Sequence, residues 1–83
     1  MLTKDELKEQ IDQLRRTHPV GSLWRHRRGG TYRIVDHGFD TGTDLPAIIY
    51  RDESMEEHGV NFIRTAKDWD SVEGSDRKFV PIT

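Results

Sequence analysis

Four arginines lie within a dozen positions of this chain, and they are its residues best suited to bind a partner. From 23 to 34 the sequence reads Leu-Trp-Arg-His-Arg-Arg-Gly-Gly-Thr-Tyr-Arg-Ile, with no acidic residue. Arginine binds carboxylates and phosphates through paired N–H groups, and neighbouring aromatic rings can stack on bases. The pattern predicts a surface for an acidic or phosphate-bearing partner. The alternative is a strand edge that is kept soluble by charge. The cluster consists of Arg25, Arg27, Arg28 and Arg33.

An acidic segment follows the arginine cluster. Between 40 and 57 the only basic residue is Arg51, and such a segment either docks on a basic protein surface or is a solvated loop. The contrast between the two segments makes head-to-tail self-association, or binding to a polar protein surface, physically reasonable. The carboxylates are Asp40, Asp44, Asp52, Glu53, Glu56 and Glu57.

Other residue types give weak signals for catalysis or metal binding. His26, His37 and His58, with Asp36, are acceptable zinc or manganese ligands, but they lie on different segments and lack ligand spacing. Asp36 and His37 are neighbours in an expected strand, which turns their side chains to opposite faces. The chain has no cysteine, and its serines and glycines match no nucleophile elbow or phosphate loop. We therefore expect no enzyme, no catalytic residue, no metal site and no cofactor.

Composition narrows the class of protein. The chain has 83 residues, of which 33% are hydrophobic and 34% charged, so it predicts one domain with a small core. A net charge of −2 means that any contact with nucleic acid is local. No apolar run is long enough for a membrane span, and the charged N-terminus does not resemble a signal peptide. These features predict a cytoplasmic protein that does not contact a membrane.

The first 19 residues predict an amphipathic helix. Thr3 and Glu6 have the spacing of a capping box, and Pro19 ends the helix because it disfavours helical backbone at the residue before it. Asp12 is expected to pair with Arg16 one turn later. The apolar positions are Leu2 and Leu7, which form a hydrophobic staple, and the stripe of Leu7, Ile11 and Leu14.

Short β-like segments make up the rest of the chain. Two glycines at 29–30 predict a tight turn, longer polar connections cover 38–45 and 52–59, and a short helical turn surrounds Trp69 at 67–70. The pattern predicts an α+β, mainly β fold, with a helix over 1–19 and a five-stranded SH3-like barrel over 20–83. The strands are expected at 23–27, 31–37, 47–51, 60–65 and 78–82.

Alternation within these strands predicts the core. The apolar run at 47–50 marks a central strand with a covered outer face, for which the helix is a candidate cover. For positions 35, 49, 63, 80 and 82 the pattern does not decide whether the side chain lies on the core face or on the outer face. The best core candidates are Trp24, Tyr32, Ile34, Ile48, Tyr50, Phe62 and Phe79.

The order of short motifs resembles an uncharacterised family of small bacterial and phage proteins, a domain of unknown function. The resemblance covers about 21–82 and rests on the order of the motifs, because no single motif is specific. Thr65 stands where the family usually has proline, and the connection at 53–58 is longer and more acidic. The motifs are the segment at 21–34, Ile-Ile-Tyr-Arg at 48–51, Phe-Ile-Arg at 62–64, the aromatic Trp69 and Lys-Phe-Val-Pro-Ile at 78–82.

The resemblance implies a small SH3-like barrel of phage or prophage type, which would act in the host cytoplasm as an accessory or host-interacting protein. It implies no established activity. We predict a protein-interaction module, with self-association as a further option. Direct nucleic-acid binding by Arg25, Arg27, Arg28 and Arg33 is the alternative. Truncation of Trp69 or Tyr50 is expected to weaken a protein interface. The predicted contact residues are Trp24, Arg25, Arg27, Arg28, Arg33, Tyr50 and Arg51.

Overall fold

The computed structural model describes residues 2–82 and begins with a 14-residue helix, α1 (Lys4–Thr17). The predicted capping box is confirmed. The Glu6 N–H donates to Thr3 Oγ1 over 3.1 Å, and the Thr3 N–H donates to Glu6 Oε1 over 3.2 Å. At the other end, the His18 N–H donates to the Leu14 carbonyl over 2.7 Å, so the helix ends just before Pro19, as predicted.

One predicted contact on α1 is wrong. The Asp12 carboxylate lies 3.4 Å from Arg15 Nη1, so its partner is three residues away and not Arg16, four residues away. Both spacings bring side chains together on a helix. Both partners are largely exposed, so this ion pair contributes little to stability.

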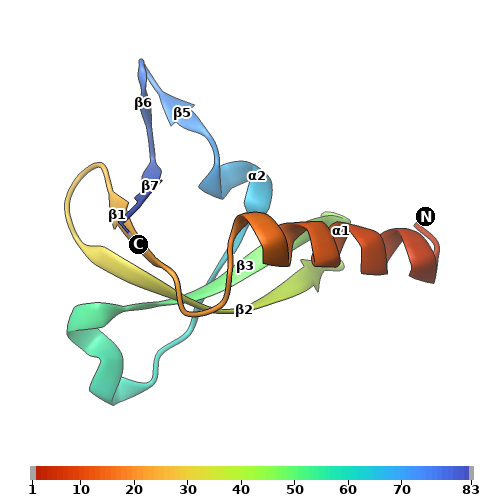
Figure 1. Ribbon diagram of the computed structural model, residues 1–83, viewed down its shortest axis with the longest axis horizontal. Coiled ribbons are helices and arrows are strands. Elements are labelled where there is room, and N and C mark those ends of the chain that lie inside the picture. The colour runs from red at the N-terminus through yellow and green to blue at the C-terminus, as the bar shows by residue number, and fades with distance from the viewer. Residues whose placement is uncertain (1, 83) are drawn as a thin grey trace.

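Five strands form one antiparallel sheet in the order β4-β3-β2-β1-β7 (Figure 1). The α+β prediction of a helix followed by mainly strands is confirmed. Within residues 2–82 no pairing joins β4 to β7, so the predicted closed barrel is not confirmed and the sheet has two edges. The strands are β1 (Leu23–His26), β2 (Thr31–Asp40), β3 (Leu45–Asp52), β4 (Phe62–Thr65) and β7 (Phe79–Pro81).

The turns between the first three strands differ in how well the sequence predicted them. Gly29 and Gly30 have φ of 102° and 90°, which confirms the tight turn between β1 and β2. The polar loop predicted at 38–45 is wrong, because β2 pairs with β3 as far as Asp40. The Asp40 carboxylate closes this hairpin by accepting from the Gly42 N–H over 3.0 Å and the Thr43 hydroxyl over 2.9 Å.

Short elements connect the remaining strands. A 3-10 helix, η1 (Glu53–His58), follows β3, and α2 (Ala66–Trp69) follows β4 close to its predicted position. The sequence did not predict the hairpin of β5 (Val72–Glu73) and β6 (Asp76–Arg77), which projects away from the main sheet (Figure 1). Strands β4 and β7 are shorter than the predicted 60–65 and 78–82.

The inner face of the main sheet carries the core. Of the predicted core residues, Tyr32 and Phe62 are partly buried against the cluster and the other five are buried. The fully buried Trp69, which the sequence did not mark as core, stacks on Phe79 with 3.8 Å between ring centroids. The buried cluster is Leu14, Trp24, Ile34, Ile48, Tyr50, Trp69 and Phe79.

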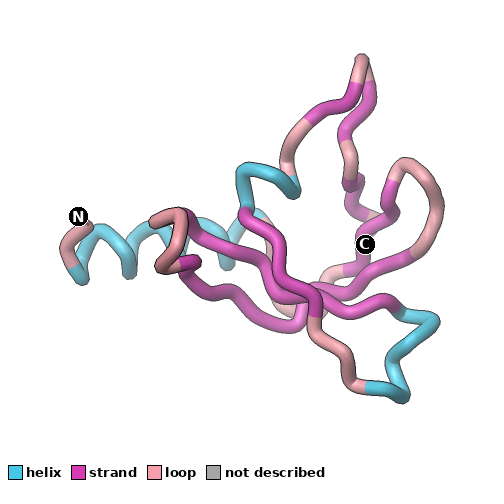
Figure 2. Tube along the Cα trace, turned by 180° about the vertical axis from the view of Figure 1, so that it is seen from behind, coloured by secondary structure: helices cyan, strands magenta, loops and turns pink. Residues whose placement is uncertain are grey.

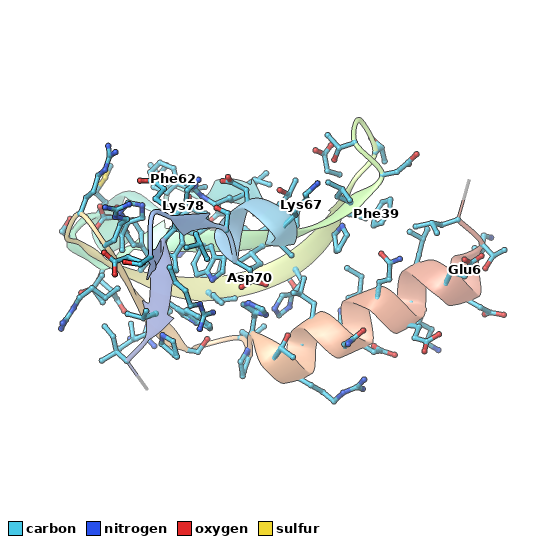
Figure 3. All side chains as sticks on the ribbon, turned by 90° about the horizontal axis from the view of Figure 1, so that it is seen from above. Glu6, Phe39, Phe62, Lys67, Asp70 and Lys78 are labelled. Atoms are coloured by element: carbon cyan, nitrogen blue, oxygen red, sulfur yellow. The ribbon has the colours of Figure 1, made fainter. Side chains whose placement is uncertain are left out.

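Helix α1 packs on this same inner side. Leu14 joins the core cluster, and α1 runs along the β2–β3 hairpin, with Glu6 near the free end of the helix and Phe39 near the hairpin tip (Figure 3). The prediction that the helix covers the outer face of 47–50 is therefore wrong. On the opposite, outer face of the sheet, Ile49 is half-buried and Ile63 is 70% exposed.

We predict that Trp69→Ala lowers the free energy of unfolding by about 3–5 kcal/mol, because it removes a fully buried ring from the centre of the core. Urea unfolding followed by circular dichroism measures this loss. The control Val72→Ala, at a position 55% exposed, should change stability by less than about 0.5 kcal/mol. A loss below about 1 kcal/mol for Trp69→Ala would contradict the central role of this ring.

Candidate functional site

The structure divides the seven predicted contact residues between the two faces of the sheet. Trp24 and Tyr50 point into the core, with 4% and 6% of their surface exposed, so they are not available to a partner. Truncation of Trp69 or Tyr50 would therefore remove core packing and would not report on an interface. The arginines remain as candidates.

Three arginines share the outer face on neighbouring strands. Arg33 of β2 lies directly opposite Arg51 of β3 and, on its other side, opposite Leu23 of β1. Arg25 follows two residues after Leu23, so alternation returns its side chain to the same face. The sheet thus brings together arginines that are up to 26 positions apart in the sequence, from 25 to 51.

Glutamates within the molecule compensate some of these charges. Arg33 Nε donates to Glu53 Oε1 over 2.6 Å, and its Nη1 donates to the Gly21 carbonyl over 2.9 Å. Arg27 Nη1 donates to Glu73 Oε2 over 2.7 Å. Arg28 Nη2 lies 3.6 Å from the same carboxylate oxygen. Arg33 and Arg27 hold η1 and the β5–β6 hairpin against the main sheet, which leaves less of their charge for a partner, whereas the Arg28 side chain is 76% exposed.

Arg25 and Arg51 keep most of their charge. Arg25 is exposed and forms no ion pair with the rest of the described chain. Arg51 Nε donates to the side-chain oxygen of Asn61 over 2.6 Å, and a neutral amide does not compensate a guanidinium. The basic character of the outer face therefore depends on these two residues.

A groove of about 300 Å³ begins at Arg25 and runs between β1, β6 and β7. Arg77 enters it from the unpredicted β5–β6 hairpin, and its Nη2 lies 3.8 Å from Asp70 Oδ1. The Gly-Ser pair at 74–75 is the turn signal that could have revealed this hairpin in the sequence. Guanidinium groups beside an aliphatic side chain suit a carboxylate or phosphate that carries apolar neighbours. The lining residues are Arg25, His26, Arg27, Asp76, Arg77 and Val80.

His26 shapes the turn beside this groove. Its Nδ1 accepts a hydrogen bond from the Arg28 N–H over 3.1 Å, which is a local bond within the turn. Burial lowers the pKa of His26 below 6.5, and the positive charges of Arg64 and Arg28 lower it further. Because the neutral ring is the form that accepts the bond, His26 is a structural part of the turn.

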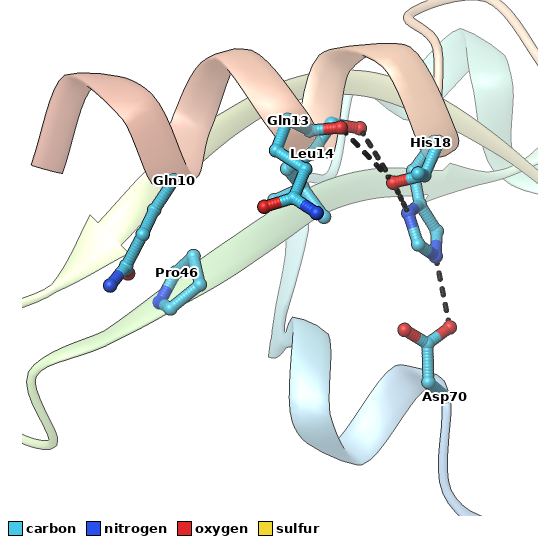
Figure 4. Close-up of a pocket in the computed structure, with 7 residues that line it drawn as sticks. Gln10, Gln13, Leu14, His18, Pro46 and Asp70 are labelled. Atoms are coloured by element: carbon cyan, nitrogen blue, oxygen red, sulfur yellow. Dashed lines mark hydrogen bonds and ion pairs between the residues drawn. The ribbon is translucent and has the colours of Figure 1, made fainter. Parts of the chain in front are cut away.

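A second cavity, of about 330 Å³, lies where the end of α1 meets α2 (Figure 4). The buried His18 ring lies between Thr17 and Asp70, with 2.7 Å from Nδ1 to Thr17 Oγ1 and 2.9 Å from Nε2 to Asp70 Oδ1. It also stacks on Trp24 with 5.2 Å between ring centroids. The Thr17 hydroxyl lies 3.3 Å from the Leu14 carbonyl, which ties it to the last turn of the helix. We interpret this arrangement as the contact that docks α1 against α2.

Three of the six carboxylates of the acidic segment are used within the fold. Asp40 closes the β2–β3 turn, Asp52 accepts from Ser54, and Glu53 pairs with Arg33. The side chains of Glu56, Glu57 and His58 lie outside the described part of the structure.

The described residues also bear on metal binding and membranes. Among them, no group of three or more histidine or carboxylate side chains could hold a metal ion. Asp36 is exposed and His37 is buried, as expected for neighbours on opposite faces of a strand. None of the helices in residues 2–82 has the length and apolar character that crossing a membrane requires.

Comparison with known proteins finds no relative: no family model, curated protein or solved structure matches the chain. A functional proposal therefore has to rest on the geometry of the outer face and the groove.

We predict that wild-type protein loses more stability than His26→Asn when the pH falls from about 7.5 to about 5.5. The pKa of His26 is lowered in the folded state, so its contribution is complete above 6.5 and is lost as the pH falls through the folded value. Asparagine keeps an acceptor for the Arg28 N–H but does not titrate. Urea unfolding of both proteins at the two pH values measures the difference, and equal losses would contradict it.

Proposed function

We propose that this protein is an interaction module that binds an acidic segment of a partner protein on the outer face of its sheet. The observation that carries the proposal is the position of Arg25 and Arg51, which no carboxylate among the described side chains compensates, on the face that also bears Val80 and Ile82. Val80 pairs directly with Arg25, and both aliphatic residues are 43% exposed. Arginine next to exposed apolar surface is typical of protein interfaces.

The aromatic residues favour a protein partner over a single-stranded nucleic acid. All seven phenylalanine, tyrosine and tryptophan residues lie within 2–82, and each is buried or half-buried. Binding of single strands relies on exposed rings that stack on bases, and this surface offers none. Direct nucleic-acid binding through the arginines is still the alternative, since phosphate contacts need no aromatic ring.

The finer class of the fold is also part of the proposal. The strand order, in which β7 returns to pair with β1 beside a four-stranded meander, supports a small SH3-like barrel. Barrels of this kind bind partners through surface grooves and loops, which agrees with a groove beside Arg25. The motif order at 21–82 supports an accessory protein of phage or prophage type.

We predict that a labelled peptide of alternating glutamate and leucine binds the full chain, and that the double variant Arg25→Ala/Arg51→Ala weakens binding about ten-fold. This corresponds to the loss of two charged contacts worth about 0.7 kcal/mol each. Fluorescence anisotropy at low and physiological salt measures the affinity. The matched control is Lys8→Ala/Arg16→Ala, which removes two positive charges from exposed positions on α1 and should leave binding unchanged.

The same titrations with single- and double-stranded DNA and RNA test the alternative. Nucleic-acid binding that persists at physiological salt, and that exceeds peptide binding, would replace the proposal if it also depends on Arg25 and Arg51. Equal weakening by both double variants would show that only net charge matters. Absence of peptide binding at low salt would contradict the proposal.

A further inference from the structure

We propose that two copies of this chain form a dimer by antiparallel pairing of their β4 strands, centred on Ile63. The surface concerned is the outer edge of β4 at one end of the main sheet, where β4 pairs with no strand of residues 2–82. An unpaired strand edge presents a row of backbone donors and acceptors to any chain that can align with it. The proposal is independent of the basic outer face, because it rests on backbone geometry and apolar exposure.

The direction of the backbone groups on the sheet can be followed from β1 outward. The Ile34 N–H donates to the Ser22 carbonyl over 3.0 Å, so the backbone groups of Ile34 point towards β1. Because direction alternates along a strand, those of Arg33 point towards β3, where they meet its partner Arg51. In β3 the residue before Arg51 is Tyr50, and its backbone N–H and C=O therefore point towards β4.

The same alternation leaves Ile63 facing outward. Phe62 is the partner of Tyr50, and Arg64 is the partner of Ile48, so the backbone groups of Phe62 and Arg64 point towards β3. The N–H and C=O of Ile63 consequently point to the open side of β4. A second Ile63 can meet the first as a hydrogen-bonded pair, with two reciprocal N–H to C=O bonds.

The other edge of the sheet is protected. The Ile82 N–H donates to the Leu23 carbonyl over 2.8 Å, so the backbone groups of Ile82 point towards β1. Those of Pro81 point to the open side of β7. Proline has no N–H, and its presence on an edge prevents the pairing of another strand. Pairing of β4 with β7 of another copy is thus disfavoured, which leaves β4 with β4 as the symmetric solution.

Side chains at β4 fit a second copy of the same surface. Ile63 is 70% exposed, more than any other large hydrophobic residue described. It lines a groove of about 250 Å³ with Gly38, Phe39, Ala47 and Ile49 among the neighbouring residues. Pairing two copies would extend this apolar surface across the symmetry axis and shield from water the flank of each Ile63 side chain that faces the axis.

The charges around β4 select the register. A pair centred on Ile63 places Arg64 opposite Phe62 of the second copy, so no like charges face each other. A pair centred on Arg64 would bring two guanidinium groups together. Figure 2 shows β4 leading directly into α2, whose Asp68 compensates Arg64 within the same copy, with 2.6 Å from Arg64 Nη1 to Asp68 Oδ2.

We predict that sedimentation equilibrium of the wild-type chain, at concentrations from micromolar to millimolar, shows a monomer–dimer equilibrium. Ile63→Lys should raise the dissociation constant at least about ten-fold, because it places two ammonium groups at the symmetry axis. The matched control Val72→Lys introduces a lysine at another exposed β-branched residue, on β5, and should leave the dimer intact. Circular dichroism verifies that both variants are folded.

Three outcomes would overturn the dimer: a wild-type chain that stays monomeric at millimolar concentration, an unchanged dissociation constant in folded Ile63→Lys, or equal weakening by both variants. A second measurement needs no variant. Amide hydrogen exchange at Ile63 should slow as the wild-type concentration rises, because its N–H becomes hydrogen-bonded only in the dimer. Exchange that does not depend on concentration, in a chain that dimerises, would show that another surface pairs.

Discussion

The contact on which the rest of the molecule depends is the stack of Trp69 on Phe79. The two rings are nearly parallel, with centroids 3.8 Å apart and an interplanar angle of 5°. Trp24 and Tyr50 meet Trp69 edge-on, at 5.6 Å and 5.0 Å. This cluster fixes α2 to β1, β3 and β7. The burial of these rings supplies stability that the backbone hydrogen bonds of the 14-residue α1 and the short strands do not provide by themselves. Only 33% of the residues are hydrophobic, and most of the aromatic ones are used in this core. The outer face is therefore left mainly with arginine and aliphatic side chains.

Charge compensation, more than the number of charges, separates structural cations from candidate binding residues. Asp68 accepts from Arg64 Nη1 over 2.6 Å and from Lys78 Nζ over 2.9 Å. The Lys78 ammonium, followed by the Arg64 guanidinium, holds the pKa of Asp68 below its usual value. Arg64 also lies over the Phe79 ring. These cations bind within the core, in contrast to Arg25 and Arg51, which pair with no carboxylate among the side chains that the structure describes.

The sequence predicted those features that depend on neighbouring residues. The Thr3–Glu6 capping box and the Gly29–Gly30 turn are signals within a few positions, and both are confirmed. The partners of the arginines could not be predicted in this way, because Glu53 is 20 positions from Arg33 and Glu73 is 46 positions from Arg27. The sequence predicted Trp24 and Tyr50 both as core residues and as contact residues. Alternation could not decide between the two roles, because the position of α2 decides which face becomes the core.

The two proposed surfaces are compatible and would reinforce each other. Arg51 lies on β3, the neighbour of β4, whereas Arg25 lies on β1 towards the other edge. A dimer built on β4 would continue the sheet from one copy into the next, and both outer faces would then lie on the same side of it. The two Arg51 side chains would flank the symmetry axis, with an Arg25 further out on each side. An acidic segment that spans the axis would meet both copies at once. Weak contacts to individual arginines would then combine through effective concentration, so a small surface with few uncompensated charges could still retain its partner.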